Sequence, residues 1–475
     1  MIPFNQTKIV CTIGPATESK EMMKKLILAG MDTMRLNFSH SYYEEHEQRL
    51  NTLKELNKEL GTNVAALLDT KGPEIRTHKF KHGVASITKG SIVKIYMDEI
   101  LGDETQFSVT YPELYLDTQV GGTIVVDDGY LLLNIIAIDK KNRMITAEAF
   151  NSHTIKDRRG INVPGMKLNL EYISPKDRED IIWGCKHGID FIAASFVRRK
   201  EDVLAIREIL EQQNNCNIQI IAKIENQEGV NNLDEITDVC DGVMIARGDL
   251  GVEVAPEEVP VIQKKIIHLC NEKNIISITA TQMLESMQEH PRPTRAEVSD
   301  VANAILDGTD AIMLSGESAI GKYPIESVNV MQNIAKRLEV EIDRKSAVSR
   351  ASKTSKSDIP TNIAVSVAYS VLQGHANLVI APTVSGNTAR LLSKFRPNTK
   401  ILALVPSEEK ARALALNSCV HAIPFELCPD TEELVKSSIK YTIENNLAKS
   451  GDRIVITGGF PIGSKTNALR IVDIE

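Results

Sequence analysis

Short apolar segments recur along most of the chain, and helix-like segments separate them. The eight segments are TKIVCTIG from Thr7, MDTMRLNFS from Met31, VAALLDTKG from Val64, DFIAASFV from Asp190, IQIIAKIE from Ile218, DGVMIARGD from Asp241, IISITATQ from Ile275 and AIMLSGES from Ala311. Most successive starts lie about 23 to 36 residues apart, the length of one strand, one helix and two loops. Eight such units with nearly continuous apolar strands predict a (β/α)8 TIM barrel, whose parallel sheet is buried on both faces.

One gap interrupts this rhythm, because about 126 residues separate Val64 from Asp190. Within the gap, GSIVKIYM, TIVVDDGYLLLNIIAI and RMITAEAF are typical of strands, and Asp128-Gly129 and Lys141-Asn142 are turn signals. We therefore predict that residues 71–166 form a small β-barrel domain inserted after the third strand. Over the carboxyl ends of the barrel strands, such a domain could act as a lid.

The last part of the chain has a different pattern. A polar stretch, DRKSAVSRASKTSKSD, indicates a linker or an exposed helix end. Beyond it, ANLVIAPT, KILALVPS, CVHAIPF and DRIVITGG alternate with helix-like segments, which predicts an open α/β sheet with helices on both faces. The predicted organisation is a barrel in residues 1–70 and 167–345, the lid in residues 71–166 and a C-terminal α/β domain in residues 346–475.

The composition is that of a globular protein, with 475 residues, 42% hydrophobic and 25% charged. Its net charge of −8 provides no global positive field that would attract nucleic acid or an anionic membrane. The seven cysteines form no CxxC pair, and no apolar run approaches the ~20 residues that cross a bilayer. Because we also identify no secretory leader, we expect a cytoplasmic protein without structural zinc.

Polar residues gather where the predicted strands end. One strand ends in Lys223 and Glu225, and the next ends in Asp249. The carboxyl ends of parallel barrel strands meet at one face, so we expect the two carboxylates to form a site for a hard divalent cation beside the lysine. The alternative is that these charges only cap buried strands where they reach water.

Other predicted strands end in the same way, and this favours a functional site, since a barrel needs no such set for stability. The whole set is Arg35, Asn37, Ser39, His40, Asp69, Thr70, Lys71, Arg76, Lys223, Glu225, Gly248, Asp249, Thr281, Ser315 and Glu317.

Three kinds of ligand are present in this set. The two carboxylates of Glu225 and Asp249 suit Mg2+ (or Mn2+). Such an ion completes its coordination shell with water and substrate oxygens. Neutral oxygens with one carboxylate suit a larger monovalent cation, and they come from Asn37, Ser39, Asp69 and Thr70. Positive charge for phosphate or carboxylate comes from Arg35, Arg76 and Lys223. The segment ARGDLGVEV adds a glycine-bordered turn whose N–H groups could hold an anion. Together these parts indicate phosphoryl transfer.

The chain resembles the pyruvate kinase family over essentially its whole length. The resemblance rests on KIVCTIGPA from Lys8, RLNFSH, LDTKGPEIR, KIEN, ARGDLGVE, TATQMLESM and PRPTRAEVSDVANAILDGTDAIMLSGESA. It implies Mg2+- and K+-dependent transfer of phosphate from phosphoenolpyruvate to ADP, giving pyruvate and ATP in the last step of glycolysis. It also implies a homotetramer.

The same resemblance implies a role for each site residue. Arg35 and Lys223 would neutralise the moving phosphoryl group, and Lys223 would also stabilise the developing enolate. Thr281 would take part in protonating the enolate carbon, with Ser315 and Glu317. Mg2+ would be held by Glu225 and Asp249, and the substrate carboxylate would be seated by Gly248 and Asp249. K+ would be held by Asn37, Ser39, Asp69 and Thr70.

The nucleotide phosphates would meet Arg76, His40 and Arg159. The segment from Arg159 to Asn162 reads Arg-Gly-Ile-Asn where the family usually has Lys-Gly-Val-Asn, so the charge survives with a different reach. Glu74 stands at the position that the resemblance associates with K+ dependence, since a lysine there would supply the charge itself. Asp128 matches a residue that closes over the site, and its alternative is an ordinary hairpin turn.

A second candidate site lies in the C-terminal domain, in a Ser/Thr/Gly loop between a strand and a helix: Thr383, Ser385, Gly386, Asn387 and Thr388. Such a loop binds phosphate through hydroxyl and N–H groups, and the alternative is an ordinary helix N-cap. The resemblance places an effector here, against residues 458–467, so we expect allosteric control by a sugar phosphate or nucleoside monophosphate. Residues 458–467 nearly imitate a phosphate-binding P-loop, but Ser464 stands where its lysine belongs.

Two other functions remain open. A Schiff-base lyase or aldolase would use Lys223, but it would not need the carboxylates and the oxygen ligands together. A catalytically inactive phosphosugar sensor would lack a metal ligand or the lysine, and neither is missing.

Overall fold

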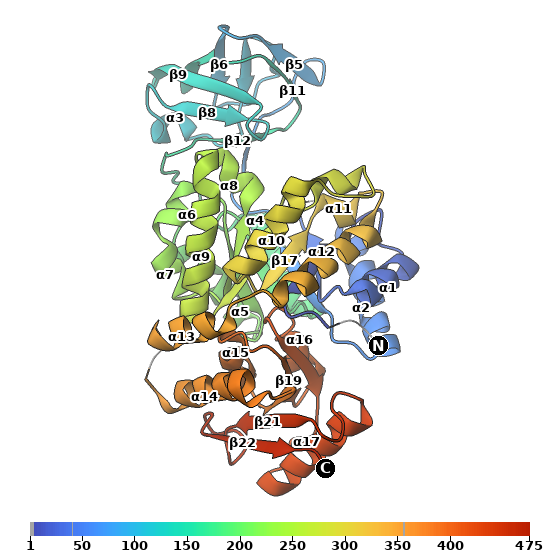
Figure 1. Cartoon of the computed structure of the whole chain (residues 1–475). Coiled ribbons are helices and arrows are strands. Elements are labelled where there is room, and N and C mark those ends of the chain that lie inside the picture. Colours follow the sequence, from blue (N-terminus) through green and yellow to red (C-terminus); the bar gives the residue numbers. More distant parts are fainter. Residues whose placement is uncertain (1–3, 40, 355–356) are drawn as a thin grey trace.

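The computed structural model of the chain describes residues 4–39, 41–354 and 357–475. Figure 1 shows a β-rich body above the barrel and an α/β body below it, at the opposite end. Among the described residues, we find no helix with the length and apolar character needed to span a membrane.

All eight predicted segments form one closed barrel of parallel strands, which confirms the predicted fold. In chain order the strands are β1 (Lys8–Thr12), β2 (Thr33–Asn37), β3 (Ala65–Asp69), β13 (Phe191–Ala194), β14 (Gln219–Ile224), β15 (Gly242–Ala246), β16 (Ile276–Ala280) and β17 (Ala311–Leu314). Neighbouring strands pair in sequence order, and β1 pairs with β17 to close the ring. The interior is filled by buried side chains such as Leu67, Phe191, Ile221, Met244 and Met313, so the barrel is a packed core rather than a pore.

Helices surround the barrel: α1 (Lys20–Ala29), α2 (Tyr43–Leu60), α4 (Pro175–His187), α5 (Lys200–Gln212), α6 (Gln227–Asn231), α7 (Leu233–Thr237), α8 (Arg247–Glu253), α9 (Val259–Lys273), α10 (Arg295–Asp307), α11 (Gly316–Ala319) and α12 (Pro324–Glu339). Helix α1 shows how the sequence specifies them. Ser19 caps its first turn by accepting from the Met22 N–H, Leu26 and Ile27 face the core, and Gly30 at φ 116° ends it.

The sequence predicts one amphipathic helix between β14 and β15, and the structure corrects this prediction. Two five-residue helices, α6 and α7, stand there, with a break at Asn232. The Asn232 side chain donates to the Arg198 carbonyl oxygen at 2.8 Å, which fixes the break against the preceding strand-to-helix loop.

The inserted segment is an all-β body with its own core around Ile95, Phe107 and Leu133. Its seven-stranded sheet has the order β4-β12-β8-β9-β10-β6-β7, and β5 pairs with β11. The elements are β4 (Ile75–Arg76), β5 (Val84–Ile87), β6 (Ile92–Tyr96), β7 (Gln106–Ser108), α3 (Leu114–Asp117), β8 (Thr123–Val126), β9 (Leu131–Asp139), β10 (Met144–Ala149), β11 (His153–Lys156) and β12 (Gly160–Asn162).

The C-terminal body is an open five-stranded sheet in the order β20-β19-β18-β21-β22, with only β22 antiparallel. Hydrophobic clusters cover both of its faces, as predicted. The elements are α13 (Arg344–Thr354), α14 (Ile359–Gly374), β18 (Leu378–Pro382), α15 (Asn387–Lys394), β19 (Lys400–Val405), α16 (Glu408–Arg412), β20 (Val420–Pro424), α17 (Thr431–Glu444), β21 (Arg453–Gly458) and β22 (Ala468–Asp473). The polar stretch that indicated a linker therefore forms α13 in large part.

Candidate active site

Lys223 lies at the centre of a buried cluster at the carboxyl end of the barrel. Its Nζ lies 2.9 Å from Asp69 Oδ1, 2.7 Å from Ser195 Oγ and 3.0 Å from Glu225 Oε1. Burial alone would lower the pKa of Lys223, but the carboxylates of Asp69 and Glu225 outweigh burial and raise it. The side chain is therefore a fixed positive charge in a buried position, with 8% of the residue exposed.

Asp69 joins Lys223 to the second cation of the cluster. Its Oδ2 accepts from Arg35 Nε at 2.7 Å, and Arg35 Nη1 donates to Thr12 Oγ1 at 2.9 Å. Burial raises the pKa of Asp69, but Arg35 and Lys223 together lower it more. The two cations are thus held on either side of one ionised carboxylate, and the remaining donor positions of the Arg35 guanidinium are available to an anionic ligand.

The two predicted metal-binding carboxylates are electrostatically coupled. Glu225 is 1% exposed, and its Oε2 accepts from the Phe196 N–H at 2.6 Å. Burial raises the pKa of Glu225, the charge of Asp249 raises it further, and Lys223 opposes both effects. A divalent cation would relieve this repulsion, so the pair fits Mg2+. Among the described residues no three His, Cys, Asp or Glu side chains cluster around a metal position, so a cation here would need ligand and water oxygens as well.

The segment ARGDLGVE differs from the predicted strand and turn. Strand β15 stops at Ala246 and helix α8 begins at once, so Gly248 and Asp249 lie in its first turn. The Gly248 N–H donates to Thr281 Oγ1 at 2.7 Å. The predicted glycine-bordered turn is therefore wrong, and the Gly248 N–H already has a partner within the chain.

Thr281 lies in a strained segment that Arg247 holds in place. Thr281 and Gln282 have φ values of 66° and 51°, in the left-handed region. The Arg247 guanidinium donates to the carbonyl oxygens of Ala280, Thr281 and Gln282 at 3.3, 2.7 and 3.3 Å, and to Asp300 at 2.7 Å. These four partners of one side chain determine where the Thr281 hydroxyl lies beside Gly248.

The four residues predicted to hold K+ come from two adjacent strands. Asn37 and Asp69 are direct register partners on β2 and β3, and Thr70 follows Asp69. Asn37 Oδ1 accepts from the Ser39 N–H at 3.1 Å. A cluster of three neutral side chains and one carboxylate fits a weakly held monovalent cation. His40, the neighbouring nucleotide prediction, lies outside the described residues.

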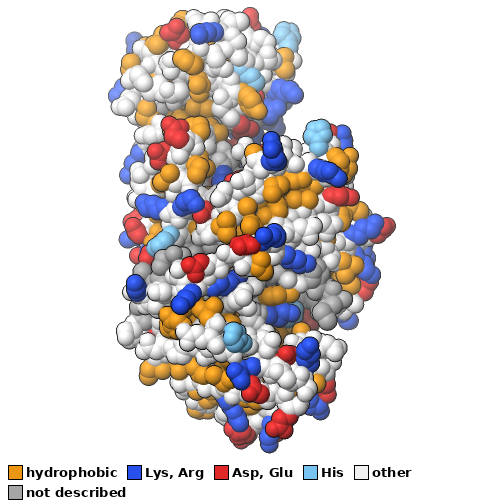
Figure 2. Space-filling model, in the orientation of Figure 1, with side chains coloured by type: hydrophobic (Ala, Val, Ile, Leu, Met, Phe, Trp, Pro, Cys, Tyr) orange, Lys and Arg blue, Asp and Glu red, His pale blue; other side chains and the backbone are white. Residues whose placement is uncertain are grey.

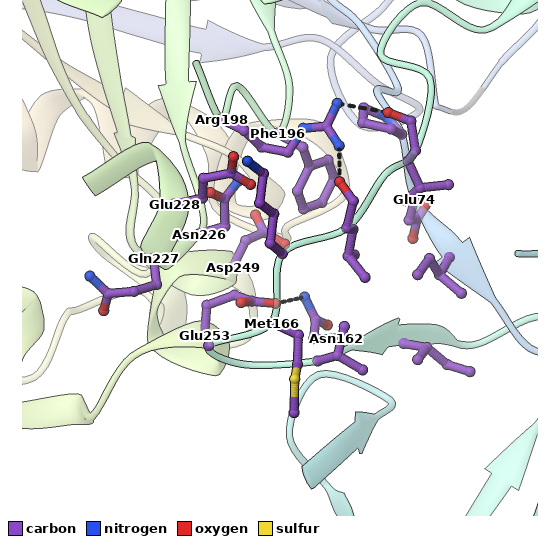
Figure 3. A pocket seen from close by; sticks show the side chains of 18 of the residues that line it. Glu74, Asn162, Met166, Phe196, Arg198, Asn226, Gln227, Glu228, Asp249 and Glu253 are labelled. Atoms are coloured by element: carbon purple, nitrogen blue, oxygen red, sulfur yellow. Dashed lines mark hydrogen bonds between the residues drawn. The ribbon is translucent and has the colours of Figure 1, made fainter. Parts of the chain in front are cut away.

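The lid reaches this site from the other side (Figure 3). A cavity of about 370 Å³ is lined by Glu74, Asp128 and Asn162 from the lid and by Asp249 and Glu253 from the barrel. Burial and the charge of Asp249 raise the pKa of Asp128, and Arg159 and Arg76 oppose them. Asp128 is thus close to Asp249 electrostatically, although it also lies in the hairpin turn that its alternative reading predicts.

The two nucleotide-binding arginines are paired within the lid. Arg76 Nη2 lies 2.7 Å from Glu74 Oε1, and Arg159 Nε lies 3.5 Å from Asp127 Oδ1. Strands β4 and β12 place them side by side, since Arg76 is the register partner of Gly160. Neither arginine lines the cavity itself, but Ile75 and Gly160, next to them in sequence, do, and each arginine has one acid as its ion-pair partner.

Ser195 was not among the predicted site residues, although its hydroxyl bonds both to Lys223 and to Asp69 Oδ1, the latter at 3.1 Å. Ser195 directly follows β13, so the rule that finds polar residues at strand ends would have found it. A contact between lid and barrel was not predicted either: Asn162 Nδ2 donates to Glu253 Oε1 at 2.8 Å. Nothing in the sequence indicates that contact, because it joins two bodies whose relative position only the structure gives.

The predicted effector loop runs from β18 to α15. Thr383 Oγ1 accepts from the Gly386 N–H at 3.1 Å, and Gly386, at φ 84°, occupies the N-cap position instead of Ser385 or Asn387. Thr388 Oγ1 lies 2.8 Å from Thr466 Oγ1, against residues 458–467. The loop therefore contacts residues 458–467, the segment against which the effector is predicted to bind.

Comparison with known proteins agrees with this geometry. The chain matches the family model for the pyruvate kinase barrel domain over residues 4–328 and that for the pyruvate kinase alpha/beta domain over residues 361–472. It is 49% identical to pyruvate kinase of Staphylococcus saprophyticus over 98% of this chain and 80% of that protein. It is also 49% identical to pyruvate kinase of Geobacillus stearothermophilus, with the same two coverages.

A solved structure of a pyruvate kinase from Cryptosporidium parvum superimposes with a TM-score of 0.95 at 39% identity, over 99% of this chain and 96% of that one. Family models, sequences and fold thus agree along nearly all of the chain. The chain is a phosphotransferase, and it belongs to the pyruvate kinase family.

Proposed function

We propose that this enzyme transfers the phosphoryl group of phosphoenolpyruvate to ADP, forming pyruvate and ATP, and that it requires Mg2+ (or Mn2+) and K+. The observation that carries the proposal is the buried cluster in which Lys223, Arg35 and Asp69 lie beside the coupled carboxylates Glu225 and Asp249. Two substrates that each carry several negative charges need compensating cations before they can approach each other.

Each side chain of the cluster has one task in this proposal. Arg35 and Lys223 neutralise the phosphoryl group, and Lys223 also stabilises the enolate oxygen. Glu225 and Asp249 hold Mg2+, which supplies further positive charge to substrate oxygens when it is bound. Thr281 lies beside Gly248, where its hydroxyl can pass a proton to the enolate carbon. The K+ ligands are Asn37, Ser39, Asp69 and Thr70.

The nucleotide enters under the lid in this proposal, with Arg76, Arg159 and His40 at its phosphates. Support comes from the cavity of about 370 Å³ between lid and barrel, which Asp128 and Asp249 both line. The contact of Asn162 with Glu253 would then break and form again as the lid moves. We also propose domain boundaries: the barrel comprises residues 1–70 and 167–345, the lid residues 71–166 and the C-terminal α/β domain residues 346–475.

The activity is tested by coupling pyruvate formation to lactate dehydrogenase, with phosphoenolpyruvate and ADP as substrates. We expect turnover with Mg2+ and K+ together, loss of turnover with a chelator, and a strong decrease when a large organic cation replaces K+. Absence of pyruvate under all conditions would refute the proposal.

The Schiff-base alternative is disfavoured by the surroundings of Lys223. Its Nζ has three oxygen partners within 3.0 Å, two of them carboxylates, and these hold an ammonium group rather than a nucleophilic amine. Borohydride treatment in the presence of phosphoenolpyruvate or pyruvate should leave Lys223 unmodified. A reduced substrate adduct on Lys223 would instead support the Schiff-base lyase function.

Assembly and regulation complete the proposal. Figure 2 shows hydrophobic side chains gathered over the face that carries α10, where Val298 and Leu306 are exposed. Exposed apolar surface of this kind supports a homotetramer, which light scattering would measure. A phosphorylated metabolite would regulate the enzyme at Thr383, Ser385, Gly386, Asn387 and Thr388.

A further inference from the structure

Ser195, which directly follows β13, connects the buried cluster around Lys223 to the point where the chain leaves the barrel for the lid. The residue is 2% exposed. Its Oγ accepts from Lys223 Nζ at 2.7 Å, and it lies 3.1 Å from Asp69 Oδ1 and 2.6 Å from the Thr70 carbonyl oxygen. The two acceptors belong to different parts of the molecule. The Asp69 carboxylate is part of the active site, whereas the Thr70 carbonyl oxygen directly precedes the chain that leads into the lid.

The Ser195 hydroxyl can donate to only one of these two acceptors at a time. A hydroxyl group has a single hydrogen to donate and rotates to place it, and this oxygen already accepts from Lys223. The shorter distance of 2.6 Å favours the Thr70 carbonyl oxygen in this structure. Asp69 is then bonded to Lys223 and Arg35, and its charge acts on the Lys223 ammonium without a third donor.

The Thr70 carbonyl oxygen stands directly before the connecting segment, residues 71–74, which joins β3 to β4. The Thr70 hydroxyl accepts from the Ser195 N–H at 3.1 Å, so these two residues are bonded twice. Gly72, at φ 72°, packs so closely that a Cβ there would come within 2.8 Å of the Ser195 carbonyl oxygen. A change of direction in the connecting segment would therefore move the Thr70 carbonyl oxygen relative to the Ser195 hydroxyl.

The second crossing of the chain between lid and barrel meets the same serine. Tyr172, between β12 and α4, is 8% exposed, and its hydroxyl donates to the Ser195 carbonyl oxygen at 3.1 Å. Arg198, from the same loop as Ser195, donates to the carbonyl oxygens of Leu168 and Leu170 at 3.0 and 2.9 Å. Both crossings are thus bonded to the loop that follows β13.

We propose that Ser195 is a positioning residue that couples the position of the lid to the charge around Lys223. When the connecting segment moves and the Thr70 carbonyl oxygen withdraws, the Ser195 hydroxyl turns to Asp69 Oδ1, which lies within reach at 3.1 Å. Asp69, with a third donor, then attracts the ammonium group less strongly, and Lys223 is freer to neutralise the phosphoryl group. The catalytic meaning of this coupling rests on the proposed function, whereas the coupling itself rests on the bonds of Ser195.

Hydrogen–deuterium exchange of the full chain tests the coupling without turnover. Ser195→Ala removes the bond to the Thr70 carbonyl oxygen, so we expect amide exchange in peptides that cover residues 70–76 to become several-fold faster. Exchange in the buried strand β19 of the C-terminal body should stay unchanged. Unchanged exchange in residues 70–76 would overturn the proposal. An equal acceleration in β19 would also overturn it, because it would indicate a general loss of stability.

A double-mutant cycle tests the effect of the coupling on catalysis. Ser195→Ala should lower kcat about tenfold, and Tyr172→Phe, which removes only a hydroxyl group, should lower it about threefold. Because both changes act through the same serine, Tyr172→Phe should have almost no further effect in the Ser195→Ala background. Tyr111→Phe is the matched control, since the Tyr111 hydroxyl donates to Asp117 Oδ2 at 2.6 Å within the lid. Its kcat should equal that of the unmodified protein.

Two kinetic results would refute the coupling. These are fold-changes in kcat that multiply in the double variant, and a kcat of Ser195→Ala equal to that of the unmodified protein. If Ser195→Ala fails to fold, Tyr172→Phe replaces it in the exchange experiment, and an unchanged rate in residues 70–76 would then contradict the proposal. If the unmodified protein forms no pyruvate under any condition, the proposed function is refuted, and hydrogen exchange still decides whether the coupling exists.

Discussion

The two ends of the barrel carry charged residues of the same types and use them in opposite ways. At the amino end an aspartate directly precedes every second strand, and each accepts the N–H of a residue on the strand before it. The four bonds are Asp32 with Ile9, Asp190 with Ala66, Asp241 with Ile220 and Asp310 with Ser277, at 2.8–2.9 Å. Each aspartate also binds one cation: Lys8, Arg412, Arg207 and Arg396, respectively.

At the carboxyl end the charges mainly bind one another. Lys223, Asp69 and Arg35 form a chain of side-chain bonds, and Glu225 and Asp249 repel each other. The amino-end aspartates complete backbone hydrogen bonding and so stabilise the fold. The charged residues at the carboxyl end instead leave charge that a bound ligand or cation would compensate. A charged residue at a strand end that binds the backbone is thus a structural cap, whereas one that binds other charged side chains is a functional group.

The largest effect should come from Lys223→Met at the carboxyl end. We expect kcat to fall roughly a thousandfold or more, because a positive charge at the reacting oxygen is lost. The coupled pyruvate assay measures it, with Lys436→Met on the exposed face of α17 as the matched control. Activity of Lys223→Met near that of the control would contradict the role given to the carboxyl end.

Asp310→Ala at the amino end should give the reverse result. Asp310 is 5% exposed and binds Ser277 and Arg396, so its removal leaves the mostly buried Arg396 side chain without its carboxylate partner. We expect a loss of about 3 kcal/mol in the free energy of unfolding, with kcat of the folded enzyme within about twofold. Urea unfolding measures the loss, and the exposed Asp234→Ala should show almost none. A large loss of kcat at unchanged stability would remove the distinction between the two ends.

Arg247→Lys refines the comparison between the two ends of the barrel. Arg247 binds backbone carbonyl oxygens, as a structural residue does, but it lies at the carboxyl end. A lysine cannot reach all three carbonyl oxygens at once, so the Thr281 segment should lose its position. We expect kcat to decrease about 10- to 100-fold, together with slower exchange of pyruvate methyl protons with deuterated water, followed by NMR. Loss of thermal stability with unchanged proton exchange would make Arg247 a purely structural residue.

The smallest effect concerns pH and Asp190. Burial raises the pKa of this carboxyl from 3.8 to about 6, although Arg412 opposes burial. The folded chain then binds the proton more tightly than the unfolded chain, so the stability contributed by this group decreases as pH rises from about 4 to about 6. Relative to Asp190→Asn, the unmodified protein should lose about 1–3 kcal/mol between these pH values. If the free energies of unfolding of the unmodified protein and Asp190→Asn, measured with urea, changed with pH in the same way, the raised pKa of Asp190 would be refuted.

The sequence was sufficient for the barrel, because all eight strands are apolar runs with a regular spacing. It also placed Lys223, Glu225 and Asp69 at one face, since strand ends of a parallel barrel converge. It predicted a turn around Gly248 where helix α8 begins instead, because whether a glycine after a strand lies in a turn or a helix depends on neighbours such as Thr281.

Other features depend on distance in three dimensions. Ser195 could have been predicted from its place after a strand, and the four amino-end aspartates from theirs. The contact of Asn162 with Glu253 could not, since it joins two bodies that no local pattern orients.

Binding of Mn2+ in the presence of phosphoenolpyruvate, followed by electron paramagnetic resonance, tests the central claim most directly. The charge stored by Glu225 and Asp249 at the carboxyl end predicts one tightly bound ion per chain, and Glu225→Gln should weaken its binding about tenfold or more. Equal affinity in the unmodified protein and Glu225→Gln would contradict the account.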